Sequence, residues 1–355
     1  MGSMNDFSTS PPKPWIATPC IHSAPLSRAA GCNIFLKLEN LQPSGSFKSR
    51  GIGNLMVRAL QSAGPSAASV HFFCSSGGNA GLACVTAAAA LGRPATVVVP
   101  LTTPPHMVAR LRELGADVVQ LGENWAAADG HLREELIAAH RAAGGAAVYV
   151  PPFDHPDIWE GAATLVDELA AQMEAPVDGV VCSVGGGGLL CGVMEGAQRL
   201  SREAAELGGA KWRVPPRVLA VETKGAASLH ASVEAGELVT LPGITSIATS
   251  LGAPRVAVKA FEWTQKAGRE GLVSAVVSDA DAIMGCSRFL DDARMLIEAA
   301  CGATIATAYN GALRRELGEG LSNEEWAKKN VVLVVCGGSN INLKMLEEYK
   351  KKYDV

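Results

Sequence analysis

The chain has 355 residues, of which 48% are hydrophobic and 19% are charged, with a formal net charge of −4. This length accommodates two domains or one large domain around a well-buried core. The weakly acidic balance offers no basic surface for nucleic acid or an anionic membrane. The longest apolar runs, such as residues 331–336, are far too short to span a bilayer. We therefore expect neither a nucleic-acid partner nor a membrane partner.

The cysteines indicate a reducing compartment. There are nine of them, an odd number, and no C-x-x-C pair occurs. Most have apolar neighbours, which favours buried free thiols over disulfides or a zinc site. The N-terminus lacks a charged segment followed by an apolar one, so no secretory signal is predicted. We expect a cytoplasmic protein whose residues 1–13 are disordered.

The first notable segment in chain order places a lysine in a turn of small residues. Residues 34–38 are mostly apolar, and residues 43–51 read Pro-Ser-Gly-Ser-Phe-Lys-Ser-Arg-Gly. An amine that is partly desolvated at Lys48 would have a lowered pKa and could act as a nucleophile or a base. The alternative is an ordinary solvated lysine beside Arg50.

The next segment predicts a strand, a turn of small residues and a helix. Residues 70–73 are strand-like, residues 74–81 read Cys-Ser-Ser-Gly-Gly-Asn-Ala-Gly, and residues 82–91 are helix-like. This order directs backbone N–H groups and a helix N-terminus toward an anion. Ser76 and Asn79 add side-chain donors, which suits a carboxylate ligand. A βα turn that needs glycine only for its conformation is the alternative.

The same alternation of strand and helix continues along the chain. The apolar runs are continuous and β-branched, as in parallel strands covered on both faces. Glycines at 115 and at 144–145 end two of the helices. The pattern predicts an α/β fold of βαβ units. The expected strand and helix pairs are 95–99 with 105–114 and 117–121 with 125–143.

In the second half, the strand-like residues 177–184 lead into four consecutive glycines, Gly185, Gly186, Gly187 and Gly188. Ordering such a run is entropically costly, but it lets several backbone amides surround a phosphate without interference from Cβ atoms. A flexible linker is disfavoured because apolar residues flank the glycines. Residues 201–216 are expected to form a surface loop, and 217–222 and 331–335 to form strands.

A reactive lysine, a carboxylate-binding turn and a phosphate-binding loop together indicate pyridoxal 5′-phosphate acting on an amino acid. With these residues in view, the chain resembles the fold-type II pyridoxal-phosphate enzymes (tryptophan synthase β-like), most closely the eukaryotic-type L-serine/L-threonine dehydratases. The resemblance covers nearly the whole chain. Its ordered motifs are Thr18-Pro19, 44–51, 75–81, 151–154, 158–161, 185–188, 221–223, 244–246, 300–303 and 336–340.

The resemblance implies two domains, each with a mainly parallel sheet flanked by helices. Residues 1–48 and 150–355 would form the large cofactor-binding domain, and residues 49–149 a small domain that closes over the substrate. The cofactor would lie between them, and the enzyme would be a homodimer.

By the same resemblance, Lys48 forms the Schiff base with the cofactor and later removes the Cα proton of the substrate. Phe47 would pack near the pyridine ring, Asn79 would hydrogen-bond the 3′ oxygen, and Cys336 would face the pyridine nitrogen. The expected cofactor-binding residues are Phe47, Lys48, Asn79, Gly185, Gly186, Gly187, Gly188, Leu189, Cys336 and Gly337; the expected substrate-binding residues are Ser46, Ser76, Gly77, Asn79 and Ala80.

A monovalent cation, usually potassium, is also implied. Oxygen-only ligation suits such a hard ion. The expected ligands are Gly185, Glu222, Ala226, Leu251 and Ala253. For Glu222 alone, a strand-end carboxylate in an ion pair is the alternative.

The function implied is β-elimination from L-serine to pyruvate and ammonia, and from L-threonine to 2-oxobutanoate. Alternatives are a β-replacement enzyme or specialised lyase acting on a β-substituted amino acid, a serine racemase, and a cofactor-binding protein without turnover. The racemase branch carries serine where this chain has Gly77, and glycine has no proton to give. The resemblance leads us to expect isoleucine and proline where this chain has Ser49 and Ala299, and these differences keep a specialised substrate open.

Overall fold

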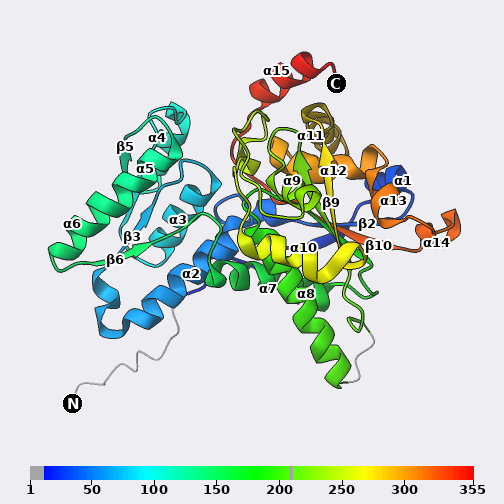
Figure 1. The fold of residues 1–355 in the computed structure, drawn as a ribbon, viewed down its shortest axis with the longest axis horizontal. Coiled ribbons are helices and arrows are strands. Elements are labelled where there is room, and N and C mark those ends of the chain that lie inside the picture. The colour runs from blue at the N-terminus through cyan, green and yellow to red at the C-terminus, as the bar shows by residue number, and fades with distance from the viewer. Residues whose placement is uncertain (1–11, 208–210) are drawn as a thin grey trace.

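A computed structural model describes residues 12–207 and 211–355 and contains two β-sheets (Figure 1). The six-stranded sheet has the order β1-β2-β10-β7-β8-β9, and the four-stranded sheet has the order β5-β4-β3-β6. The strands are β1 (Cys20–His22), β2 (Asn33–Lys37), β3 (Val70–Cys74), β4 (Ala95–Val99), β5 (Asp117–Gln120), β6 (Ala146–Tyr149), β7 (Gly179–Ser183), β8 (Arg217–Thr223), β9 (Leu272–Val277) and β10 (Asn330–Val334).

Helices lie between the strands, as the alternating pattern predicted. They are α1 (Ala24–Ala30), α2 (Lys48–Ala63), α3 (Asn79–Ala90), α4 (Pro105–Glu113), α5 (Trp125–His131), α6 (Ile137–Ala142), α7 (Pro156–Gln172), α8 (Gly188–Leu207), α9 (Ser228–Ala235), α10 (Val258–Gly271), α11 (Asp279–Ala293), α12 (Ala299–Tyr309), α13 (Ala312–Leu317), α14 (Asn323–Ala327) and α15 (Leu343–Tyr353). A π-helical stretch, Leu132–Leu136, joins α5 to α6. The predicted α/β fold class is confirmed.

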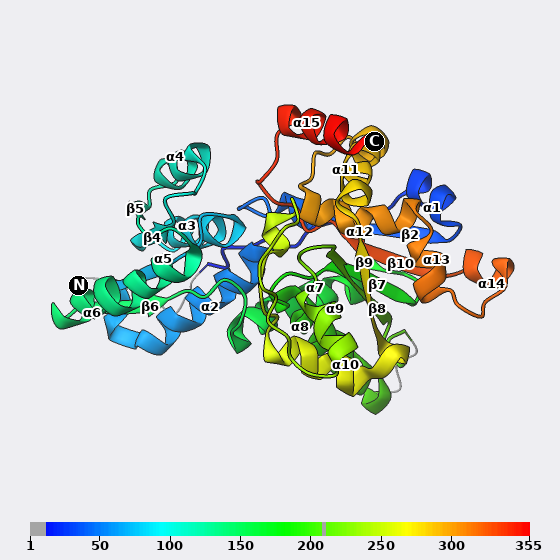
Figure 2. The same cartoon turned by 45° about the horizontal axis from the view of Figure 1, so that its top comes forward.

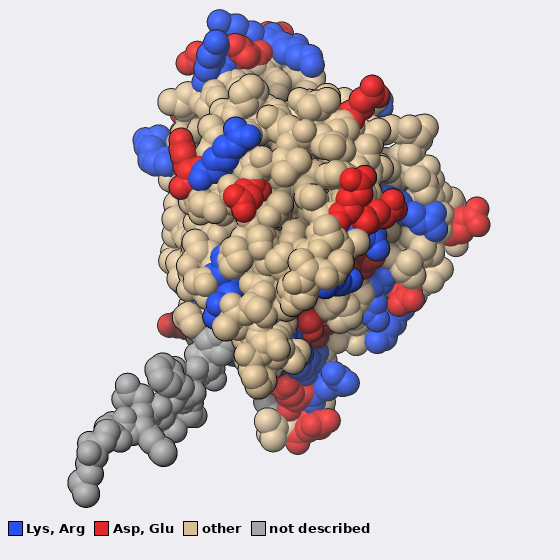
Figure 3. Space-filling model, turned by 90° about the vertical axis from the view of Figure 1, so that its left-hand side faces the viewer, with Lys and Arg blue, Asp and Glu red and all other residues tan. Residues whose placement is uncertain are grey.

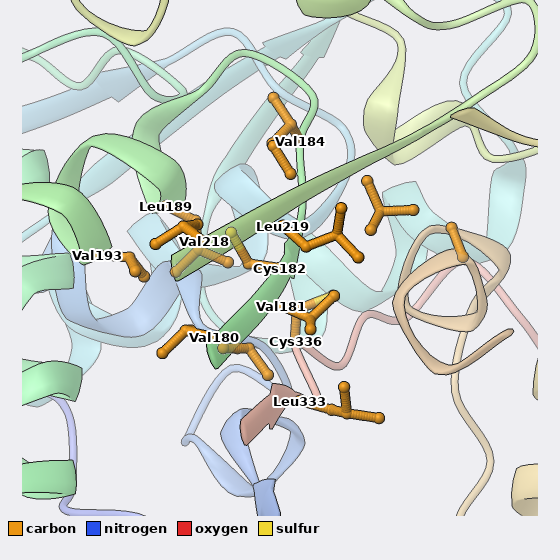
Figure 4. Close-up of a cluster of buried hydrophobic side chains, with 14 of the residues drawn as sticks. Val180, Val181, Cys182, Val184, Leu189, Val193, Val218, Leu219, Leu333 and Cys336 are labelled. Atoms are coloured by element: carbon orange, nitrogen blue, oxygen red, sulfur yellow. The ribbon is translucent and has the colours of Figure 1, made fainter. Parts of the chain in front are cut away.

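The six-stranded sheet is parallel except for β1, which pairs antiparallel with β2 at one edge. Every residue of β7 is buried, which explains its continuous apolar sequence. Figure 4 shows how the sheet builds its core: Val181 from β7 and Leu219 from β8 pack in one cluster with Leu333 from β10. This packing holds the C-terminal ends of the central strands at one edge of the sheet.

The four-stranded sheet is entirely parallel, with β3 between β4 and β6. Neighbouring side chains of β3 point to opposite faces. Phe72 packs with Ile52 and Met56 of α2, whereas Phe73 packs with Ala128 and Leu132 beneath the α5–α6 segment. Covering both faces satisfies the burial that a parallel sheet needs.

Helix α2 connects the two halves. It contacts both α3, which flanks the small sheet, and α7, which flanks the large one. Figures 1 and 2 show α2 running from the six-stranded sheet toward the four-stranded sheet. Its first residue is Lys48, so the predicted reactive lysine lies where the chain passes between the two sheets.

A buried ionic cluster anchors the start of α2. Arg50 is fully buried and donates two hydrogen bonds to the carboxylate of Glu39, from Nε and Nη2, each 2.7 Å long. It also contacts both carboxylate oxygens of Glu168 on α7, at 2.6 and 2.7 Å. Lys37 Nζ donates to Glu168 Oε2 at 2.6 Å. Arg50 therefore links α2 to α7 and to the segment after β2.

One prediction about the chain's organisation is wrong, and one lies outside the described residues. Residues 201–216 were expected to form a loop, but α8 continues to Leu207, because Leu200 and Ala204 still pack against the large core. The expectation of disorder at residues 1–13 falls mostly on residues 1–11, which the structure does not describe.

Three further observations concern membrane-spanning helices, thiols and the distribution of surface charge. No helix in the described part of the chain combines the length and apolarity needed to cross a bilayer. All nine cysteines are free, and eight of them are buried. On the face shown in Figure 3, uncharged residues fill most of the centre and charges of both signs are mixed toward the rim.

Candidate active site

The amine of Lys48 lies in a partly desolvated position between two aromatic rings. Its Nζ donates to the carbonyl of Pro152 at 2.6 Å. It is 5.2 Å from the ring centroid of Phe47 and 6.0 Å from that of Phe153. Burial lowers the pKa of Lys48 from 10.5 to about 8, although the nearby Cys74, Cys336 and Glu298 oppose the shift. A larger share of this amine is therefore neutral, and nucleophilic, near neutral pH than for a solvated lysine.

The four glycines form the turn between β7 and α8, and none of them has room for a side chain. A Cβ at Gly186 would lie 2.3 Å from the Phe153 ring, and one at Gly185 would lie 3.0 Å from Leu251 Cα. Gly187 has a φ of +90°, which glycine adopts readily. The turn leaves bare backbone at the N-terminus of the 20-residue helix α8, whose first amides have no acceptor within the helix. These residues fit a phosphate group.

Asn79 begins α3 and reaches from the small-sheet half to the large-sheet half. Its Nδ2 donates to Glu298 Oε1 at 2.9 Å, and its Oδ1 accepts from the backbone N–H of Ser339 at 3.0 Å. In the same turn, Ser76 Oγ accepts from the backbone N–H of Gly78 at 3.3 Å. Ala80 is buried behind the turn.

Gly77 lies against Thr103 from the segment after β4. A Cβ on Gly77 would lie 2.7 Å from Thr103 Cγ2. The predicted carboxylate-binding residues Ser76, Gly77, Asn79 and Ala80 are thus together in one turn at the C-terminal end of β3.

Cys336 is brought close to the lysine turn by backbone pairing. Phe47 N donates to the Cys336 carbonyl at 3.1 Å, and Ser46 forms a bridge with Gly337. The Cys336 thiol is buried and lies 3.4 Å from Ser183 Oγ at the end of β7. Figure 4 shows Cys336 beside Val181 and Cys182.

Ser46 and Ser49 flank the lysine differently. Ser46 Oγ is buried without a hydrogen-bond partner among the described residues, so its hydroxyl is available to a ligand. Ser49 Oγ lies 2.8 Å from Ser44 Oγ and accepts from Ser44 N at 3.2 Å. Ser49 therefore closes the turn that precedes α2, while Ser46 offers an unused polar atom beside Lys48.

The predicted cation ligands lie on several chain segments, and Glu222 is hydrogen-bonded to backbone amides. Glu222 is fully buried, and its two oxygens accept from Leu229 N at 2.9 Å and His230 N at 2.7 Å. Burial raises the pKa of Glu222 from 4.5 to about 8. Backbone amides at the start of α9 thus contact this carboxylate, and the ion-pair alternative is not what the structure shows.

The other expected ligands lie on neighbouring segments. Gly185 packs closely against Leu251, whose carbonyl accepts from Ala253 N at 2.8 Å, and Ala226 is fully buried. In the described residues no group of three or more His, Cys, Asp or Glu side chains could hold a metal ion. The cation site stays a prediction.

Sequence reasoning missed several residues of this region. Phe153 and the Pro152 carbonyl belong to a motif that was noted but given no role. Glu298, which contacts Asn79, was not singled out, because it directly precedes α12 in an otherwise unremarkable apolar segment. Only the proximity of distant chain segments reveals it.

Comparison with known proteins identifies the family. Residues 13–337 match the family model described as "Pyridoxal-phosphate dependent enzyme". The chain is 44% identical to human "Serine dehydratase-like" over 335 residues, covering 94% of each chain. It is 44% identical to bovine "L-serine dehydratase/L-threonine deaminase" over 336 residues, again covering 94% of each. The structure aligns with a fungal L-serine ammonia-lyase from Rhizomucor miehei with a TM-score of 0.81 and 38% identity, covering 96% of this chain and 99% of the other.

The chain therefore belongs to the pyridoxal-phosphate dependent enzymes, and its fold is that of fold type II. The predicted family resemblance is confirmed. The geometry also suits the cofactor: a partly desolvated amine, a bare glycine turn and an unused buried hydroxyl lie around one region.

Proposed function

We propose that this enzyme is an L-serine dehydratase (ammonia-lyase) that also acts on L-threonine. It would convert L-serine to pyruvate and ammonia by β-elimination, and L-threonine to 2-oxobutanoate and ammonia. The observation that carries the proposal is the position of the Lys48 amine, which donates to the Pro152 carbonyl and lies near Glu298, the carboxylate that binds Asn79. The names of the similar human, bovine and fungal proteins support the same substrate class.

In this proposal, Lys48 holds the cofactor and then takes the Cα proton of the substrate. Its lowered pKa suits a base near neutral pH, because a protonated amine could not accept the proton. Pyridoxal phosphate would supply an electron-withdrawing system that makes this proton acidic. Gly185, Gly186, Gly187, Gly188 and Leu189 would hold the phosphate at the start of α8.

The substrate would be oriented by its carboxylate. Ser76, Gly77, Asn79 and Ala80 would bind it with backbone and side-chain donors, and the unpartnered Ser46 hydroxyl lies on the lysine side of the site. The Cys336 thiol would face the pyridine nitrogen, with Gly337 beside it. A neutral thiol would not hold a proton on that nitrogen as a carboxylate would, which favours prompt loss of the β-hydroxyl over reprotonation at the cofactor carbon. A proton from the cofactor phosphate would let the hydroxyl leave as water.

The test is keto-acid formation from L-serine and L-threonine by purified enzyme loaded with cofactor. Lys48→Ala should abolish it, whereas Lys224→Ala, at an exposed lysine, should not. No pyruvate from L-serine would overturn the substrate assignment. D-serine on chiral chromatography would indicate a racemase, and product formed only from β-substituted serines would indicate a specialised lyase.

We further propose the finer organisation that the family resemblance implied. The two sheets support a large domain of residues 1–48 and 150–355 and a small domain of residues 49–149. The nine free thiols support a cytoplasmic location. We also propose a homodimer, which sedimentation analysis tests. A potassium ion is proposed at Gly185, Glu222, Ala226, Leu251 and Ala253, and thermal melting in potassium salts tests it.

A further inference from the structure

Glu298 is a buried carboxylate at the junction of the two halves of the molecule. Its side chain is 3% exposed, and it directly precedes α12. A Cβ at position 338 would lie 1.9 Å from Glu298 Cδ, and Gly338 has a φ of +113°. The backbone of residues 337–340 is therefore shaped around this carboxyl group.

The two oxygens of Glu298 accept from two different donors. Oε1 accepts from Asn79 Nδ2 at 2.9 Å, and Oε2 accepts from the backbone N–H of Asn340 at 3.0 Å. Burial raises the pKa of Glu298, but both of its oxygens act as acceptors in these contacts, as those of a carboxylate do. A glutamine at this position would place an NH₂ group against one of the two donors.

This arrangement determines which way the Asn79 amide faces. Its Oδ1 already accepts from Ser339 N at 3.0 Å. Reversing the amide would turn its NH₂ group toward the Ser339 N–H and its oxygen toward the carboxylate, and both contacts would be repulsive. One N–H of Asn79 is thus used by Glu298. The other donates to Ser250 Oγ over a long 3.3 Å contact, which a ligand oxygen can replace because Ser250 Oγ also accepts from Asn340 Nδ2 at 2.9 Å.

We propose that Glu298 is a positioning residue that acts through Asn79. Its carboxylate holds the Asn79 amide with the second N–H directed at the cofactor's 3′ oxygen, and it ties the first turn of α3 to the large-sheet half. Glu298 is not required to contact substrate or cofactor for this role. The inference rests on the proposed role of Asn79 in the proposed function.

The test measures cofactor binding without substrate. Apoenzyme is titrated with pyridoxal phosphate by equilibrium dialysis, and the absorbance spectrum of the bound cofactor is recorded. Glu298→Gln is expected to weaken binding by about 10- to 100-fold, the loss of one charge-assisted hydrogen bond, and to change the spectrum. Glu195→Gln is the matched control, since Glu195 lies on α8 and burial raises the pKa of both Glu195 and Glu298. It should bind cofactor as the parent does.

A double-mutant cycle separates this role from a merely structural one. Asn79→Ala should weaken binding by a similar factor, and adding E298Q to it should cause little further loss. A full additional loss in the Asn79→Ala background, or no loss and no spectral change in E298Q alone, would overturn the inference.

A folding defect is handled by a second variant. Melting curves of each apoprotein show whether it folds. If E298Q does not fold, Glu298→Asp, which keeps an acceptor-only group, should retain the parent spectrum at reduced affinity. An E298D spectrum that differs from the parent's contradicts the proposal. Because no substrate is present, a wrong assignment of L-serine as substrate leaves these results unaffected.

Discussion

The buried ionic cluster at the start of α2 makes a quantitative stability prediction. Arg50→Met removes a guanidinium that contacts both oxygens of Glu39 and both oxygens of Glu168. Glu39 is fully buried and would be left as an uncompensated charge. Removing one partner of a buried ion pair costs about 3–5 kcal/mol. We therefore expect R50M to lose stability of that order.

Helix α2 offers a matched control in Arg58. This residue pairs with Asp157 at 3.6 Å, but its side chain is 45% exposed. An exposed pair contributes only about 0–1 kcal/mol because water and salt screen it. Arg58→Met removes the same charge from the same helix, so the difference between R50M and R58M isolates the effect of burial.

Thermal melting of the apoproteins measures this difference. For cooperative unfolding of 355 residues, an unfolding entropy of about 2.1 cal/mol/K per residue sums to ~0.75 kcal/mol/K, so R50M should melt ~4–7 °C below the parent. Urea unfolding gives an independent value. Equal losses in R50M and R58M would refute the reasoning, as would a loss below about 1 kcal/mol in R50M. Arg50→Lys should not restore the parent stability, because lysine lacks the planar fork that binds two carboxylates.

Three further predictions concern the site. Gly186→Ala should weaken cofactor binding in equilibrium dialysis, because its methyl group would lie 2.3 Å from the Phe153 ring; Gly243→Ala, with nothing within 4 Å, should bind as the parent does. The rate at which apoprotein captures pyridoxal phosphate in stopped-flow absorbance should rise with pH and level off above pH 8, because the pKa of Lys48 is lowered to about 8; a rate still rising through pH 10 would contradict the desolvation of this amine. Without potassium, the stability contributed by protonated Glu222 should be lost as pH rises from 4.5 to about 8, because its pKa is raised in the folded state. Glu222→Gln should flatten that pH profile in thermal melts and abolish any stabilisation by potassium chloride over choline chloride; an unchanged profile would show that Glu222 does not titrate in this range.

Most strands, helices and turns could be predicted from the sequence, because each depends on the residue types within its own short segment. The run 95–99 is β-branched and continuous, and β4 occupies that segment. The glycines at 185–188 require a turn without side chains, and the packing of Phe153 and Leu251 against them supplies the physical reason. The end of α8 was misjudged because the mixed polar composition of residues 201–216, with its glycines and prolines, suggested a loop, whereas the contacts of Leu200 and Ala204 with the core keep the chain helical as far as Leu207.

The contacts within the site could not be predicted in the same way. Asn79 and Glu298 are 219 positions apart, and no pattern near either residue indicates the other. The Pro152 carbonyl that accepts from Lys48 is likewise 104 positions away. Such pairs arise from the packing of two sheets, so the nature of the site could be read from motifs while its supporting hydrogen bonds could not.

The place of Lys48 at the first residue of α2 has a mechanical consequence. The chain crosses from the six-stranded to the four-stranded sheet at this point, and the ionic cluster around Arg50 ties the crossing to α7. When one rigid body tilts against another, atoms near the pivot travel least. If the four-stranded sheet rocked about this crossing, residues 76–80 would move farther than the reactive nitrogen, which would stay nearly in place.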